Sequence, residues 1–130
     1  MENADLQRLE ALLDQAELQQ ALNQVDGILN SSPTDVDALV VKGRILGASG
    51  DLDKALQFMD QALAHRPEHL LAKGYKGVLL YELQQPAPAE VLLTEALAGP
   101  GESPAPFHYT LARCYGRLER HAQALEQVEA

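Results

Sequence analysis

Hydrophobic residues in the middle of the chain recur at intervals of three and four positions, which is the spacing of one face of a helix. Leu39, Gly43 and Leu46 share one such face. A second apolar stripe follows over residues 52–63. The intervening Gly50-Asp51 suits a helix C-terminus followed by an N-cap. The pattern therefore predicts two antiparallel helices joined by a tight turn.

This helix pair recurs along the chain every 34 residues, and the interval becomes 35 after the loop at residues 99–104. The matching columns include Leu12, Leu46, Leu80 and Tyr115; Ala21, Ala55, Ala89 and Ala124; and Gly43, Gly77 and Ala112. We predict four units of paired helices at about 2–35, 36–69, 70–104 and 105–130, with the last unit incomplete. The columns of small residues indicate that neighbouring helices approach closely.

Composition supports an all-α fold, because 23 Leu and 19 Ala far outnumber the nine Val and Ile. The formal net charge of −9 disfavours binding to nucleic acid or to an anionic membrane. No apolar run approaches the length of a membrane span, and the acidic N-terminus lacks the features of a secretory signal. We therefore expect a soluble, cytoplasmic protein consisting of a single repeat domain over residues 1–130.

The 34-residue unit with Gly50-Asp51-Leu52, followed by Ala55-Leu56 and closed by Pro67, resembles the tetratricopeptide repeat. The resemblance covers about three and a half repeats. It implies a right-handed superhelical array of antiparallel helix pairs, an α-solenoid in which the first helix of each pair lines a concave groove. It also implies a protein or peptide as the partner and protein binding as the function.

Transferring the family's groove positions to this chain gives a candidate peptide-binding surface. The groove residues implied by the resemblance are Val40, Val41, Arg44, Leu71, Tyr75, Val78, Tyr109, Arg113 and Arg117, together with Leu6, Gln7, Glu10, Leu13, Asp37, Ala48, Tyr81, Glu82 and Thr110. Tyrosine and arginine are enriched at binding hot spots, so the surface suits a peptide with apolar anchors and some acidic groups. The family's clamp for acidic C-termini is not expected, because its columns hold Leu6, Glu10, Val41, Leu71 and Tyr75.

No residues form a catalytic, cofactor-binding or metal-binding pattern. His65 and His69 have helical spacing, but Pro67 lies between them at a helix junction. Cys114 falls in a column of small or aliphatic residues, so we expect a buried thiol without a neighbouring base. We therefore expect a non-enzymatic protein that binds no cofactor and no metal.

We interpret the chain as an interaction scaffold or adaptor that binds a peptide segment of its partner in the concave groove. One alternative is the N-terminal repeat module of a larger enzyme, of transferase or oxygenase type. Another is self-assembly as a homodimer through an uncovered C-terminal edge that contains Leu125 and Val128.

Overall fold

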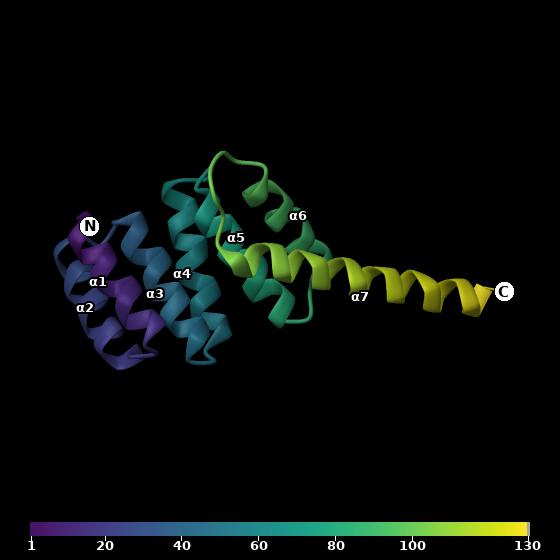
Figure 1. Ribbon diagram of the computed structural model, residues 1–130, viewed down its shortest axis with the longest axis horizontal. Helices are drawn as coiled ribbons and strands as arrows, with labels where there is room; N and C mark the ends of the chain where they lie inside the picture. The colour runs from purple at the N-terminus through teal and green to yellow at the C-terminus, as the bar shows by residue number, and fades with distance from the viewer. Residues whose placement is uncertain (130) are drawn as a thin grey trace.

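The computed structural model describes the backbone of residues 1–129 and the side chains of residues 1–120 and 122. Over residues 1–129 the chain forms only helices, arranged in sequence from the N-terminus to the long last helix (Figure 1). These are α1 (Asn3–Asp14), α2 (Leu18–Ser31), α3 (Val36–Ala48), α4 (Leu52–His65), α5 (Leu70–Glu82), α6 (Pro86–Leu97) and α7 (Ala105–Glu129). The prediction of an all-α solenoid is confirmed. None of the described helices combines the length and the apolar character needed to cross a lipid bilayer.

The turns within the first three helix pairs share one backbone geometry. Ala16, Gly50 and Gln84 occupy equivalent positions and have φ angles of +57°, +91° and +66°. At the second turn, the Asp51 N–H donates to the Leu46 carbonyl at 2.9 Å and the Gly50 N–H donates to the Gly47 carbonyl at 3.1 Å. The other two turns repeat this pair of hydrogen bonds, which is the Schellman arrangement. A left-handed residue therefore ends the first helix of each of these pairs.

Equivalent N-caps begin the first helices of the second and third pairs. The Asp35 carboxylate accepts a hydrogen bond from the Ala38 N–H at 3.1 Å. His69, 34 residues later, accepts the corresponding hydrogen bond from the Ala72 N–H at 3.2 Å through Nδ1. Each side chain thus satisfies a backbone donor that the first helical turn leaves free.

The small columns mark the places where paired helices touch, as the sequence predicted. A β-carbon at Gly43 would lie 2.7 Å from Cε of Met59, on α4. The equivalent β-carbon at Gly77 would lie 2.8 Å from Cγ of Leu93, on α6. Each β-carbon would also lie 3.2 Å from a backbone carbonyl oxygen of the paired helix, that of Ala55 or Ala89, so the two glycines let the backbones approach closely.

The fourth unit differs from the prediction, because α7 is one continuous helix of 25 residues and not a helix pair. The second unit turns at Ser49-Gly50-Asp51, and the aligned residues of the fourth unit are Leu118, Glu119 and Arg120. Neither glycine nor an N-capping residue occupies these positions, and Leu, Glu and Arg all favour helix. The helix therefore runs on and extends beyond the helix pairs (Figure 1).

A face of α7 is left uncovered by this continuation. Ala112 is exposed, whereas the equivalent Gly43 and Gly77 are buried against α4 and α6. Tyr115, at the position of Leu46 and Leu80, is 51% exposed. The proposed dimer edge at Leu125 and Val128 lies outside the residues whose side chains are described.

Candidate functional site

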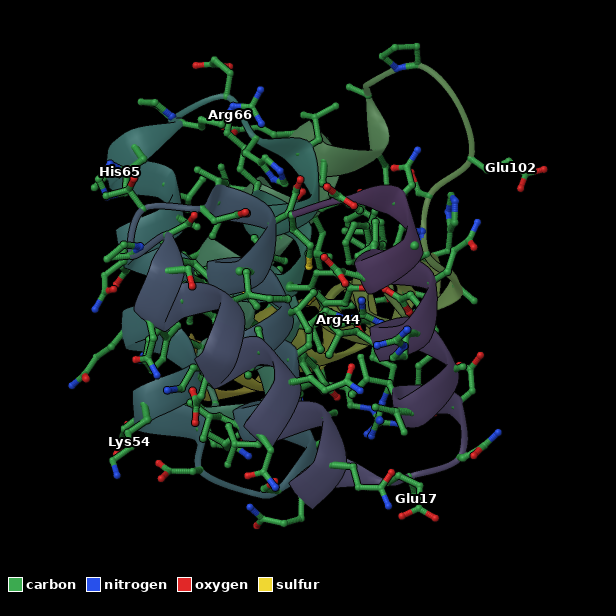
Figure 2. The ribbon with its side chains drawn as sticks, turned by 90° about the vertical axis from the view of Figure 1, so that its left-hand side faces the viewer. Glu17, Arg44, Lys54, His65, Arg66 and Glu102 are labelled. Atoms are coloured by element: carbon green, nitrogen blue, oxygen red, sulfur yellow. The ribbon has the colours of Figure 1, made fainter. Side chains whose placement is uncertain are left out.

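The first helices of the three pairs, α1, α3 and α5, together with α7 line one side of the array, here called the inner face. Arg44 of α3 reaches across this face to α1, where it pairs with Glu10. Nη1 donates to one carboxylate oxygen, and Nη2 donates to the other at 3.1 Å. Figure 2 shows Arg44 in the middle of the molecule beside α1, while Lys54, His65 and Arg66 project from the outer edges.

Aromatic contacts extend this link to α5 and α7. The Arg44 guanidinium carbon lies 4.7 Å from the centre of the Tyr75 ring. The Tyr75 ring in turn meets Phe107 edge to face, with 5.0 Å between ring centres. Gly74 makes room for Phe107, because a β-carbon there would lie 2.1 Å from Cε2 of that ring. The row Glu10–Arg44–Tyr75–Phe107 thus joins four helices of the inner face.

The neighbours of Arg44 stabilise its positive charge. Burial alone would lower the pKa of Arg44, but the hydrogen bond to Glu10 and the negative charges of Glu10 and Asp14 outweigh it and raise that pKa. Burial also raises the pKa of the Tyr75 phenol, although Arg44 opposes the shift. Arg44 is therefore an internally neutralised cation, with only 21% of its side chain exposed.

An open cavity of about 440 Å³ adjoins this row. Apolar groups from α1, α3, α4 and α5 form most of its wall, and we call it the inner pocket. The residues that line it are Leu13, Asp14, Ala16, Leu18, Gly43, Arg44, Gly47, Ala48, Met59, Tyr75, Val78, Leu79, Glu82 and Pro106. A largely apolar concavity with a few polar groups is typical of a binding site.

A second group of inner-face residues lies between α5 and α7 and is here called the tyrosine–arginine cluster: Tyr81, Tyr109, Arg113 and Arg117. The Arg113 guanidinium lies 5.1 Å from the Tyr81 ring centre and 5.3 Å from that of Tyr109. Arg117 lies 4.6 Å from the Tyr81 ring centre and donates to Gln84 Oε1 at 2.6 Å. Tyr81 is buried, whereas Tyr109 is 65% exposed.

The structure divides the candidate groove residues into separate groups. Arg44, Tyr75 and Val78 meet in the inner pocket. Tyr109, Arg113 and Arg117 belong to the tyrosine–arginine cluster. Leu71 is 43% exposed but does not line the inner pocket.

Two of the candidate residues do not lie on an open surface. Val40 is 3% exposed and belongs to the hydrophobic core formed with α4 and α5. Val41 is 2% exposed and packs in the core beneath α1 and α2. Because α3 is covered on both of these sides, placing the Val40-Val41 pair in the groove was wrong.

Pocket-lining residues that sequence reasoning missed include Asp14, Gly47 and Met59. Gly47 carried a usable signal, because it occupies the column of Leu13 and Tyr81. A missing side chain in a column of large residues leaves space between the flanking helices. Met59 gave no such signal, because it lies on α4 and reaches the pocket only where its side chain packs against Gly43.

The histidine and cysteine residues considered as candidates for metal binding or catalysis have structural roles. His69 caps α5, and its Nε2 lies 3.5 Å from the Asp37 carboxylate. Cys114 is buried as expected, and burial raises the pKa of its thiol. In the described part of the chain, no three His, Cys, Asp or Glu side chains are grouped closely enough to hold a metal ion.

Paired helices that stack into a solenoid with a lined inner face define the class of helical-repeat proteins. Sequence comparison gives the family. Two family profiles, both described as Tetratricopeptide repeat, match residues 6–68 and 46–105. The chain belongs to the tetratricopeptide repeat family.

One curated relative is a TPR repeat-containing protein, MJ1345, from Methanocaldococcus jannaschii. It is 40% identical over 68 residues, which cover 52% of this chain and 21% of the relative. The match thus spans about a fifth of the length of that relative.

Solved structures show the same fold at low sequence identity. The Sgt2 TPR domain from Aspergillus fumigatus gives a TM-score of 0.78 at 18% identity, covering 90% of this chain and 78% of that one. The first TPR domain of Spaghetti (RPAP3), bound to the HSP90 peptide SRMEEVD, gives a TM-score of 0.74 at 13% identity. The match covers 87% of this chain and 89% of that one.

Proposed function

We propose that this protein is an interaction scaffold that holds a segment of a partner protein in the inner pocket. The observation that carries this proposal is the pocket itself, an apolar cavity of about 440 Å³ shared by helices of three successive repeats. The salt bridge and ring contacts of Arg44 fix its walls before a ligand arrives. A preformed site lowers the entropy lost on binding.

A structure of the same fold supports peptide binding as the function. The Spaghetti domain has the same fold and is bound to a peptide in its structure. We propose the same general role here, with binding by burial of apolar side chains and without catalysis. The partner is then a protein segment, short enough to enter the space between α1, α3 and α5.

Ala48 offers a direct test, because it lines the inner pocket and its own side chain is exposed. A tryptophan there fills the pocket without entering the core. Ala64→Trp is the matched control, since Ala64 is an exposed helical alanine of α4 that does not line the pocket.

The experiment selects binders from a random dodecapeptide library displayed on phage, using the immobilised 130-residue chain. We expect selected peptides to bind the wild type and Ala64→Trp equally and to lose binding to a folded Ala48→Trp variant. Equal binding to both variants would place the site elsewhere. Failure to select any peptide would contradict the proposal itself.

Self-association is a second candidate function, favoured by the uncovered face of α7. Ala112 and Tyr115 are exposed there, although their equivalents contact a second helix in the other pairs. A second copy of the chain covering this face would form a homodimer. Light scattering on the wild type and on Tyr115→Glu tests it: a dimer that dissociates in the variant supports self-association, and a wild-type monomer excludes it.

A further inference from the structure

Two carboxylates form the acidic rim of the inner pocket. Asp14 and Glu82 line it from α1 and α5, and both residues are exposed. Among the described residues that line the pocket, Arg44 is the one cation, and Glu10 already neutralises it. Among the side chains that the structure describes, neither Asp14 nor Glu82 has an ion-pair partner. The rim therefore carries two carboxylates without an ion-pair partner among the described side chains.

Both carboxylates also stand where the fold itself disfavours them. Asp14 is the last residue of α1, and Glu82 is the last residue of α5. The C-terminus of a helix carries a partial negative charge, which repels a carboxylate. The two residues occupy equivalent repeat positions, and in α3 the same position holds Ala48, at the mouth of the pocket. The helix ends thus give no reason for this arrangement; Asp14 also interacts favourably with the Arg44 charge, but Glu82 has no such interaction, and attraction of a cation accounts for both carboxylates.

We infer that the segment bound in the inner pocket is basic as well as apolar. An aliphatic side chain enters the space between Leu13, Val78 and Leu79. A lysine or arginine of the same segment lies at the mouth, between Asp14 and Glu82. This inference rests on the proposed function, and it specifies the chemistry of the partner.

An acidic segment fits this pocket poorly. It would meet the two rim carboxylates and an arginine whose charge is already neutralised. The other inner-face arginines, Arg113 and Arg117, lie in the tyrosine–arginine cluster and do not line the pocket. The HSP90 peptide in the Spaghetti structure, SRMEEVD, contains three acidic residues, so the chemistry inferred here is of the opposite sign. The net charge of −9 also favours a basic partner at long range.

To test this inference, the dodecapeptides selected above are sequenced. The affinity of the strongest binder is then measured by fluorescence anisotropy. The binding variant is Asp14→Asn/Glu82→Gln. The control is Asp53→Asn/Glu102→Gln, which removes the same charge from exposed residues outside the pocket lining. Each titration is repeated at about 50 and about 300 mM salt, because screening weakens exposed charge pairs.

We expect selected peptides to place an aliphatic residue within a few positions of lysine or arginine. The Asp14→Asn/Glu82→Gln variant should bind about tenfold more weakly, with a reduced salt dependence, and the control less than twofold more weakly. The melting temperature of the binding variant should stay close to that of the wild type, because two helix ends lose an unfavourable charge while Arg44 loses one nearby negative charge. A merely structural role for these carboxylates would instead lower that temperature.

The outcomes separate this inference from the proposed function. Suppose that Ala48→Trp blocks binding but the selected peptides are acidic, or that they bind Asp14→Asn/Glu82→Gln as tightly as they bind the control variant. Either result contradicts a basic partner and leaves the pocket as the binding site. If no peptide is selected, or if Ala48→Trp blocks none, the proposed function fails and the inference fails with it.

Discussion

Gly77 of α5 lies so close to Leu93 of α6 that a β-carbon would come within 2.8 Å of Leu93 Cγ and 3.2 Å of the Ala89 carbonyl oxygen. The second of these contacts is backbone, which cannot rotate away. The glycine thus sets the distance between the two helices of this pair.

Replacing Gly77 with leucine should therefore be severely destabilising, by about 3 kcal/mol or more, because the new side chain forces α5 and α6 apart. Urea unfolding monitored by circular dichroism measures the loss. Gly27→Ala is the matched control: Gly27 lies within α2, where a β-carbon would meet nothing within 4 Å. It should stabilise the protein by up to about 1 kcal/mol through helix propensity. Equal effects of the two substitutions would refute the close-packing assignment.

The turn between α1 and α2 predicts a stabilising substitution. Ala16 has a φ of +57°, a conformation that glycine adopts at lower cost. Ala16→Gly should raise the free energy of unfolding by about 0.5–1 kcal/mol. Gly50→Ala at the equivalent turn, where φ is +91°, should lower it. Thermal melts of both variants check the prediction, and it is wrong if the two changes have the same sign.

The continuity of α7 depends on the residues at its middle. Glu119→Gly with Arg120→Asp restores the turn residues of the second unit, and we expect the helix to break there into an antiparallel pair. Spin labels at positions 108 and 126 measure the change. In a straight helix they are about 27 Å apart, at 1.5 Å per residue. A hairpin brings them to less than about 15 Å, since packed helices lie 8–10 Å apart. An unchanged distance in the double variant would show that local sequence does not control the helix.

Acid should weaken the N-cap of α3. Burial alone would raise the pKa of Asp35, but hydrogen bonds from the Met1 ammonium and the Ala38 N–H outweigh it and lower the pKa below its ordinary value of 3.8. The folded-state pKa is thus below the unfolded one. The stabilisation is complete above about pH 4 and is lost as the pH falls through the folded-state pKa.

The comparison that checks this is urea unfolding of the wild type and Asp35→Asn between neutral pH and about pH 2.5. Asparagine retains a capping oxygen but has no charge. The wild type should be the more stable protein at neutral pH, and the difference should shrink below about pH 4. A difference that is constant over the whole range would contradict the assignment.

Repetition in the sequence predicted the helix pairs and the glycine contacts, because each depends on neighbours at fixed spacing. The residue type of Asp51 predicted the cap that it forms with the Lys54 N–H of α4. The inner face was harder to predict. Helix α3 contacts α2, α4 and α5, so several of its faces are apolar, and hydrophobicity alone did not distinguish the buried Val40 and Val41 from pocket residues. The continuity of α7 was missed because matching Ala124 to its column implied a turn that the residues before it do not favour.

Extensive contacts in this array join helices of the same pair or of adjacent pairs. In such a chain the end units open more readily than the middle, so amide hydrogens of α1 and α2 should exchange with solvent sooner than those of α4 and α5. A segment seated in the inner pocket would touch α1, α3 and α5 at once and tie three units together. Binding would then slow amide exchange in α1. A bound partner would therefore also stabilise the N-terminal unit of the array against local opening.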